Sequence, residues 1–186
     1  HIVTINMEWL DKPSFAHFIH DITQEKKELD RLHQQAHIDA LTQVGNRYYF
    51  QDEMQRFLDC KTTATLCYCD LDHLKYVNDN YGHDKGDTYI CDFVEILKSN
   101  IREDDIIARL GGDEFCILFI NGSIDSINQK MEFINEEFSK QAVDYPQSFS
   151  YGTIYINGNE DTFLLKILQI ADQRMYALKR KRKMTT

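Results

Sequence analysis

The chain has 186 residues, of which 42% are hydrophobic and 12% aromatic, enough to bury a core and too many for a disordered chain. Its net charge of −9, from 21 basic and 30 acidic residues, argues against a general nucleic-acid binder. The sequence has no secretory signal and no apolar run of about 18 residues, so we expect no membrane segment in this stretch. Because it begins with His1 rather than Met, we expect a piece of a longer protein.

Five cysteines occur in the middle of the chain, and no two of them form a C-x-x-C pair: Cys60, Cys67, Cys69, Cys91 and Cys116. An odd set without this spacing favours reduced, mostly buried thiols in a cytoplasmic protein over a disulfide framework or a zinc site. Cys67 and Cys69 alternate along an apparent strand, which favours core packing over metal ligation.

Two short strands and a polar helix are predicted before residue 38. Residues 2–9 and 14–20 read as strands around the turn Asp11-Lys12-Pro13. Residues 22–37 are polar, with apolar residues seven positions apart that predict a coiled-coil-like helix too short to be stable alone. These apolar residues are Ile22, Leu29 and Ala36, with Leu32 between them.

This N-terminal arrangement, a strand pair that runs into Asp21-Ile22-Thr23 and a charged helix, is similar to the end of a PAS sensory domain. The resemblance implies that residues 1–21 are the terminal hairpin of a truncated PAS domain and residues 22–37 a helical signalling linker. The alternative is a private hairpin of the domain that follows, which we expect over residues 38–186.

From residue 38 the chain alternates helices and strands. The expected helices cover residues 47–59, 73–81, 87–100, 126–141 and 162–181. The expected strands cover residues 63–71, 106–110, 114–120 and 148–156. This order predicts an α/β (α+β) sandwich, in which helices flank a central mixed, mainly antiparallel sheet.

Two carboxylates, Asp70 and Asp72, stand at the C-terminal end of the strand 63–71, where alternation places them on one face. Neighbouring carboxylates are costly unless they are solvated or neutralised by a cation. Oxygen ligands at a strand end suit Mg²⁺, which takes one or two carboxylates and completes its coordination with substrate phosphates. A helix cap or a solvated turn explains the pair alone equally well.

The residues Gly111-Gly112-Asp113-Glu114 connect two predicted strands. The Gly-Gly pair allows the positive φ angles of a tight hairpin turn, whose tip can approach a ligand closely. If this hairpin pairs with the strand that ends at Asp70, three or four carboxylates converge, as metal-assisted phosphoryl or nucleotidyl transfer requires. The alternative is a surface hairpin whose acidic residues serve solubility.

The polar residues 75–87 follow the first carboxylates closely, so Lys75 is near enough in sequence to reach a phosphate. An Asn amide and an Asp carboxylate in such a stretch can recognise guanine. The carboxylate accepts from the ring N–H and the exocyclic amine, a pattern that adenine does not offer.

Five motifs, in order, resemble those of the GGDEF family of diguanylate cyclases. Arg109 to Phe115 contains the signature letter for letter, and Asp70 to Asp87 matches D-x-D-x-F-K-x-x-N-D-x-x-G-H-x-x-G-D except for Leu74 in place of Phe. The other three are Asp39 to Arg47 (D-x-L-T-x-L-x-N-R, with Val44 for Leu), Ser150 to Gly152 (S-x-G) and Ala171 to Lys179 (A-D-x-A-M-Y-x-A-K). The resemblance runs from about residue 38 to the end.

The resemblance implies a palm-like, nucleotidyl cyclase-like fold and a homodimer in which two GTP molecules condense to cyclic di-GMP with release of pyrophosphate. It implies two Mg²⁺ ions per active site, which Mn²⁺ could replace, bound by Asp70, the Leu71 carbonyl, Asp113 and Glu114. Asp70, Asp113 and Glu114 would be catalytic. Asp113 is the better candidate for accepting the hydroxyl proton, and a metal-bound hydroxide is the alternative.

By the same resemblance Asn78 and Asp87 would bind guanine, and Lys75, Lys179 and Lys183 would bind phosphates. The family's closing G-R-N reads Arg182-Lys183-Met184 here, so Lys183 replaces an arginine. This replacement keeps the charge but loses the bidentate fork.

Arg102 and Asp105 form an R-x-x-D pair, and Arg102 precedes Gly111 by nine residues, the spacing of the family's inhibitory site. A guanidinium can bind a phosphate or the Hoogsteen edge of guanine, and a carboxylate can accept from guanine N–H groups. We therefore expect cyclic di-GMP to bind there. The alternative is a solvated acidic turn in which Arg102 balances charge.

Three functions fit the motifs. An active cyclase is favoured because both signature acids, Asp70, Asn78 and Asp87 are present. A catalytically silent domain that acts as a receptor for GTP or cyclic di-GMP is the second. A relative that makes adenine-containing dinucleotides is the third, and Asp87 argues against it.

Overall fold

The computed structural model describes residues 2–9, 12–19, 23–24, 27, 32, 37–60, 62–157 and 164–183. The chain divides into two compact units, residues 1–36 and 37–186. In the part of the chain that the structure describes, no helix is both long and apolar enough to cross a membrane.

The first unit contains an antiparallel hairpin of β1 (Ile2–Trp9) and β2 (Lys12–Ile19). The predicted hairpin is confirmed, but β2 begins at Lys12 instead of residue 14, and Pro13 pairs with Glu8. Proline is tolerated there because both strands of a two-stranded sheet are edge strands. That this hairpin ends a PAS domain stays a prediction.

The predicted helix 22–37 falls mostly on residues outside the described part, including Ile22, Leu29 and Ala36. Within it the structure describes four helical residues: Thr23, Gln24, Lys27 and Leu32. The coiled-coil seam therefore also stays a prediction.

The second unit is built on a five-stranded sheet in the order β3-β5-β6-β4-β7. The strands are β3 (Gly45–Asn46), β4 (Thr63–Leu71), β5 (Ile106–Gly111), β6 (Glu114–Ile120) and β7 (Phe149–Asn157). Only β3 and β5 pair in parallel, so the predicted mixed, mainly antiparallel sheet is confirmed. Strand β3 was not predicted, because two residues carry no readable alternation.

The described part of this unit has five helices, of which the last follows β7 and the others lie between strands: α2 (Arg47–Asp59), α3 (Leu74–Tyr81), α4 (His83–Asn100), α5 (Ile124–Ser139) and α6 (Leu164–Lys183). The predicted start of α4 at residue 87 was wrong, since only Gly82 separates α3 from α4. Gly82 has a φ of 89°, which allows one helix to stop and the next to begin within a single residue. Helix α3 therefore begins shortly after β4, and α4 follows α3 after a single residue.

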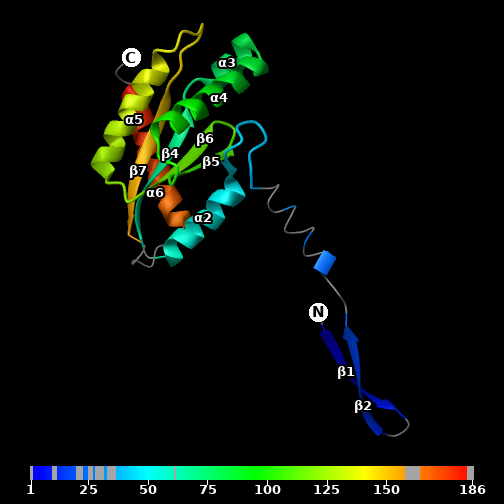
Figure 1. Cartoon of the computed structure of the whole chain (residues 1–186). Helices are drawn as coiled ribbons and strands as arrows, with labels where there is room; N and C mark the ends of the chain where they lie inside the picture. Colours follow the sequence, from blue (N-terminus) through cyan, green and yellow to red (C-terminus); the bar gives the residue numbers. More distant parts are fainter. Residues whose placement is uncertain are drawn as a thin grey trace. The chain divides into compact units, whose positions relative to one another are not determined.

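Helices cover both faces of the sheet, with α3, α4 and α5 on one face and α2 and α6 on the other (Figure 1). Strand alternation divides the side chains between the two cores. Cys67 and Cys69 face the α3–α5 side, whereas Leu66 and Tyr68 face the α2–α6 side. The prediction that Cys67 and Cys69 pack in the core is confirmed, because both are fully buried free thiols.

Replacing Gly152 with alanine should destabilise the domain, because α6 lies directly against β7 at this residue. An alanine Cβ would lie 2.2 Å from the Ala171 carbonyl oxygen and 2.4 Å from the Met175 nitrogen, both backbone atoms of α6. We expect the free energy of unfolding, measured by urea denaturation, to fall by about 1–3 kcal/mol.

Gly45 provides the matched control, because an alanine Cβ there would meet the ring of Tyr49 instead of backbone. Tyr49→Ala should therefore relieve Gly45→Ala, whereas Met175→Ala should not relieve Gly152→Ala. Unchanged stability of the Gly152→Ala protein would contradict the close packing of α6 on β7.

Candidate functional site

Two acidic residues, Asp70 and Glu114, face each other at one end of the sheet. Strands β4 and β6 are antiparallel, and Asp70 is the cross-strand partner of Glu114. Because β4 also pairs with β7, Asp70 lies between Glu114 and Ser150. The expectation that the glycine-rich hairpin pairs with the strand ending at Asp70 is confirmed.

The tip of this hairpin differs by one residue from the prediction. Gly111 pairs with Glu114, so the connection consists of Gly112 and Asp113 rather than the two glycines, and an irregularity lies between Arg109 and Gly111. The φ angles of Gly111 and Gly112 are 150° and 50°, which only glycine adopts readily. The Asp113 carbonyl accepts a 3.0 Å hydrogen bond from the Leu71 amide, which joins the tip to the end of β4.

Two arginine side chains donate hydrogen bonds to carbonyl groups of the hairpin backbone. The Arg109 guanidinium donates to the Gly112 carbonyl at 2.8 and 3.0 Å and forms an ion pair with Asp39 at 3.1 Å. Arg47, at the start of α2, donates to the Leu110 carbonyl at 3.1 Å. The segment around Asp39 is thus connected through Arg109 to the tip that carries Asp113.

Asp39 is itself held by its neighbours. Its carboxylate accepts from the Thr42 amide at 2.9 Å and from the Thr42 hydroxyl at 2.7 Å. Burial acts to raise the pKa of Asp39, but the hydrogen bonds from Thr42 and Arg109 and the charge of Arg109 outweigh it and lower this pKa. The stabilisation from this carboxylate is therefore present above its ordinary pKa and is lost as the pH falls through the lowered value.

The Asp70 carboxylate is paired with Lys179 of α6. Burial raises the pKa of Asp70; the hydrogen bond and charge of Lys179 oppose this, and the charges of Asp113 and Asp72 add to it. Burial acts to lower the pKa of Lys179, but Asp70, Asp72 and Asp113 reverse this and raise it. The lysine therefore stays charged, and it only partly offsets the cost of placing Asp70 among other carboxylates.

The carboxylate of Asp72 is hydrogen-bonded to side chains of the fold. Strand β4 ends at Leu71, but the Asp72 carboxylate still lies on the same side as Asp70, as predicted, because the Lys179 ammonium that pairs with Asp70 is 3.7 Å from Asp72. The Asp72 carboxylate is buried and accepts hydrogen bonds from the Ser150 and Ser148 hydroxyls at 3.0 and 3.1 Å. The Tyr89 hydroxyl lies 2.7 Å from the Asp72 carbonyl oxygen, so Asp72 connects β7 and α4 to the end of β4.

Glu114 contacts a tyrosine of the neighbouring strand. The Tyr68 hydroxyl donates to Glu114 Oε1 at 2.8 Å. Burial, together with this hydrogen bond and the charge of Glu114, raises the pKa of Tyr68, so the phenol stays protonated. Tyr68 therefore remains a donor wherever Glu114 is ionised.

The side chains of Asp70, Asp113 and Glu114 offer only oxygen ligands, which are those that Mg²⁺ prefers. Asp70 and Glu114 are directly opposed, and like charges in that position destabilise a sheet unless a cation neutralises them. The residues thus fit a divalent cation chemically. Within residues 37–60, 62–157 and 164–183, however, no three His, Cys, Asp or Glu side chains are gathered into a metal-binding group, so the expected convergence of three or four carboxylates is not seen in this conformation.

The predicted guanine-binding residues lie on the helix pair that follows β4. Asn78 is half-buried on α3, and Asp87 is exposed on α4. The Asn78 side chain lies directly over Gly86, where an alanine Cβ would be 1.9 Å from its oxygen. The absence of a side chain at residue 86 therefore lets Asn78 lie next to the turn of α4 that carries Asp87.

The three lysines predicted to bind phosphate have different surroundings. Lys75 is exposed on the first turn of α3, directly after the carboxylates. The Lys179 ammonium donates a hydrogen bond to the Asp70 carboxylate and lies 3.7 Å from the Asp72 carboxylate. The side chain of Lys183 is outside the described part, so its role stays a prediction.

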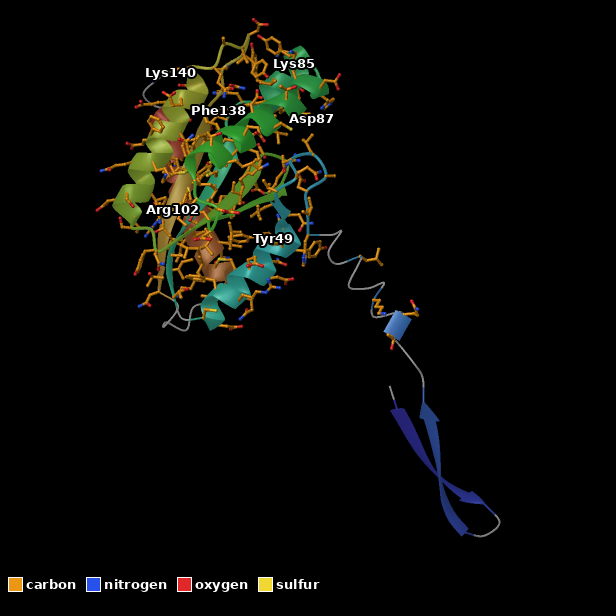
Figure 2. The ribbon with its side chains drawn as sticks, viewed as in Figure 1. Tyr49, Lys85, Asp87, Arg102, Phe138 and Lys140 are labelled. Atoms are coloured by element: carbon orange, nitrogen blue, oxygen red, sulfur yellow. The ribbon has the colours of Figure 1, made fainter. Side chains whose placement is uncertain are left out.

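The R-x-x-D pair forms a turn before β5. Asp105 accepts from the Arg102 amide at 3.0 Å and from the Ile120 amide at 3.1 Å, so its carboxylate ties this turn to the end of β6. The Arg102 side chain is exposed and lies far from Asp87 (Figure 2). The predicted inhibitory residues are thus separate from the predicted guanine-binding residues.

Reasoning from the sequence missed four residues that contact the signature hairpin: Asp39, Arg47, Tyr68 and Arg109. Three of them stand at the ends of motifs that were quoted only as family markers. Tyr68 is two residues before Asp70, and strand alternation could have placed it on the same face.

Asp39→Asn should loosen the hairpin tip. The change keeps the shape of the side chain but removes the charge that pairs with Arg109, so the Gly112 carbonyl loses a fixed donor. We expect amide hydrogen exchange of residues 111–115 to accelerate about tenfold, as the loss of a charged hydrogen bond implies.

The control is Glu137→Gln, which removes an exposed ion pair with Lys140 and should leave exchange in the hairpin unchanged. Identical exchange of residues 111–115 in the Asp39→Asn protein and the unmutated protein would show that Arg109 does not need Asp39 to hold the tip.

Comparisons with known proteins agree with this geometry. A family model for the diguanylate cyclase GGDEF domain matches residues 36–185. The diguanylate cyclase DgcM of Escherichia coli K12 is 30% identical over 167 residues, which cover 87% of this chain and 40% of that protein. The cyclic di-GMP phosphodiesterase PdeB of Shewanella oneidensis is 29% identical, with 82% of this chain and 19% of that protein covered.

A solved structure shows the same fold. The coiled coil and GGDEF domain of DgcB from Caulobacter crescentus, in complex with c-di-GMP, matches with a TM-score of 0.75 and 26% identity over 86% of this chain and 89% of that chain. This chain spans less than half the length of the two curated relatives above. From its motifs, its sheet order and the family model, the chain belongs to the GGDEF domain family of diguanylate cyclases.

Proposed function

We propose that the chain is an active diguanylate cyclase that condenses two GTP molecules into cyclic di-GMP and two pyrophosphates. One observation carries the proposal: the register that places Asp70 opposite Glu114, with Asp113 at the adjacent tip. This is the arrangement that a cation-assisted attack on a phosphate requires. The intact signature and the diguanylate cyclases among the relatives support it.

Asp70, the Leu71 carbonyl, Asp113 and Glu114 would bind two Mg²⁺ ions, which when present supply charge neutralisation at the reacting phosphate. The 3′-oxygen of one GTP forms a bond to the α-phosphorus of the other, and the bond from that phosphorus to pyrophosphate breaks. Asp113 accepts the proton of the attacking hydroxyl. Lys75 and Lys179 bind the phosphates, and for Lys179 this requires its ammonium to be shared with or released from Asp70.

Asn78 and Asp87 bind the guanine edge, and the lack of a side chain at Gly86 lets the Asn78 amide lie beside the turn that carries Asp87. Lys183 would add positive charge near the phosphates. Each subunit holds one GTP, so two subunits must meet as a homodimer for both bonds to form. The hairpin of residues 1–21 as the end of a PAS domain, the linker 22–37 and a cytoplasmic location complete this proposal.

Product inhibition is part of the same proposal. Arg102 is exposed and free to reach a product phosphate, while Asp105 already accepts two backbone N–H groups. Cyclic di-GMP would therefore depend on Arg102 more than on Asp105 for its binding. A structural relative in complex with c-di-GMP supports product binding to this fold.

The alternative function is a catalytically silent receptor for GTP or cyclic di-GMP. One relative is named as a cyclic di-GMP phosphodiesterase, so likeness over this domain alone does not fix the activity of the whole protein, and a receptor stays an alternative. The intact carboxylates favour the cyclase.

The deciding experiment incubates the protein with GTP and Mg²⁺ and detects the product by mass spectrometry. We expect cyclic di-GMP, and we expect Asp70→Asn and Glu114→Gln each to lower its rate of formation at least about a hundredfold. Both changes keep side-chain shape, so circular dichroism should show an intact fold. Binding of GTP without any product would favour the receptor instead.

Guanine selection is tested by calorimetric titration with GTP and ATP. We expect GTP to bind more tightly by at least about tenfold, because adenine does not offer the ring N–H and exocyclic amine pattern that the Asp87 carboxylate accepts from. Asp87→Ser should reduce this preference, and Gly86→Ala should do so by displacing the Asn78 amide. Gly86→Ala should add nothing in an Asn78→Ala background, and equal affinities for GTP and ATP in the unmutated protein would contradict the guanine assignment.

A further inference from the structure

Tyr68 lies outside the five family motifs, yet its hydroxyl contacts a signature carboxylate. It stands on β4 opposite Cys116, while Asp70, two residues later, stands opposite Glu114. Tyr68, Asp70 and Glu114 therefore share one face of the sheet, with Tyr68 and Glu114 as diagonal neighbours. A tyrosine side chain is long enough to reach a diagonal neighbour on the adjacent strand. The Tyr68 hydroxyl lies 2.8 Å from Glu114 Oε1.

The tyrosine ring is a fixed support for this hydrogen bond. Tyr68 is only 8% exposed and packs in the core between the sheet and the helices α2 and α6. A buried phenol needs a hydrogen-bond partner, and a ring held in a packed core moves less than an exposed side chain. The position of the ring thus defines the position of Glu114.

Asp70 and Glu114 receive their donors from different elements. Lys179 contacts Asp70 from α6, and Tyr68 contacts Glu114 from within β4. The lysine supplies charge and a flexible side chain, whereas the tyrosine supplies a neutral donor from a rigid one. A neutral donor orients a carboxylate without cancelling the negative charge that attracts a cation.

We propose that Tyr68 is a positioning residue that orients the Glu114 carboxylate beside Asp70 for binding a divalent cation. This inference rests on the proposed function, in which Glu114 and Asp70 bind that cation together. The bond is made to Oε1, so it leaves the role of the carboxylate as a ligand intact. Groups that hydrogen-bond to metal-binding side chains typically change metal affinity about 10- to 100-fold.

The test is Tyr68→Phe, which removes one hydroxyl and keeps the ring. Mn²⁺ binding is measured by calorimetry on the whole chain in the presence of GTP whose 3′-hydroxyl has been removed, so that no turnover occurs. We expect the affinity for Mn²⁺ to fall about tenfold, the lower end of that range, because Glu114 can still be hydrated. In turnover assays the Mg²⁺ concentration for half-maximal rate should rise by a similar factor, while KM for GTP at saturating Mg²⁺ stays unchanged.

Tyr151→Phe is the matched control. Tyr151 is a buried tyrosine of the adjacent strand β7, and its hydroxyl donates to the Asn128 carbonyl of α5 on the other face of the sheet. It should leave Mn²⁺ affinity unchanged, which separates positioning of Glu114 from general loss of a buried hydroxyl. Thermal unfolding of both variants controls for stability.

Equal Mn²⁺ affinity of Tyr68→Phe and the unmutated protein would overturn the inference even if cyclic di-GMP is made. So would the absence of Mn²⁺ binding by the unmutated protein. If the unmutated protein binds Mn²⁺, loses affinity on Tyr68→Phe and makes no cyclic di-GMP, the proposed function fails while the role of Tyr68 stands.

Discussion

The opposition of two carboxylates across a strand pair is the constraint on which the rest of the site depends. Asp70 and Glu114 are cross-strand partners at the end of the sheet, a position where like charges repel. The surrounding residues offset this repulsion in different ways. Lys179 provides an opposite charge for Asp70, and Tyr68 provides a neutral donor for Glu114. Arg109 and Arg47 donate hydrogen bonds to carbonyl groups of the hairpin that carries Glu114. The pairing of Asp70 with Lys179 and of Glu114 with Tyr68 therefore lowers the cost of placing two carboxylates opposite each other.

Short connections join the helices that carry the other proposed site residues to the strand that carries Asp70. Helix α3 begins three residues after the end of β4, and a single glycine separates it from α4. Lys75, Asn78 and Asp87 are therefore carried on a helix pair whose position is fixed by the same strand that carries Asp70. The buried Asp72 strengthens this link, because its contacts with Ser148, Ser150 and Tyr89 join β7 and α4 to the end of β4. Asp72 thus stands beside Asp70 in the sequence, but its contacts link elements of the fold.

Membership in a family and activity are separate conclusions for this chain. The GGDEF family model covers residues 36–185, and curated relatives of the same domain include both a diguanylate cyclase and a cyclic di-GMP phosphodiesterase. The match covers only part of these relatives, so likeness over this domain alone does not fix the activity of a whole protein. What distinguishes the possibilities within this chain is the state of its own site. Its signature acids are intact, its hairpin is in register with Asp70, and Gly86 leaves space for the Asn78 amide.

The sequence by itself determined the family, the helix and strand order apart from β3, and the identity of the acidic residues, because motif spacing and alternation are local properties of the chain. It placed β4 and β6 at their observed bounds, and it located the hairpin whose glycines have positive φ. The tertiary structure alone decided which side chains contact these residues. Lys179 is distant from Asp70 in sequence, Asp39 is distant from Arg109, and only strand order and helix packing bring each pair together. The partners of Asp72 also depend on the tertiary structure. Its place near Asp70 in the sequence suggested a metal ligand, but its carboxylate accepts hydrogen bonds from Ser148 and Ser150. Local pattern fixes where a side chain stands on its own element, whereas its partners depend on which other elements pack against that face.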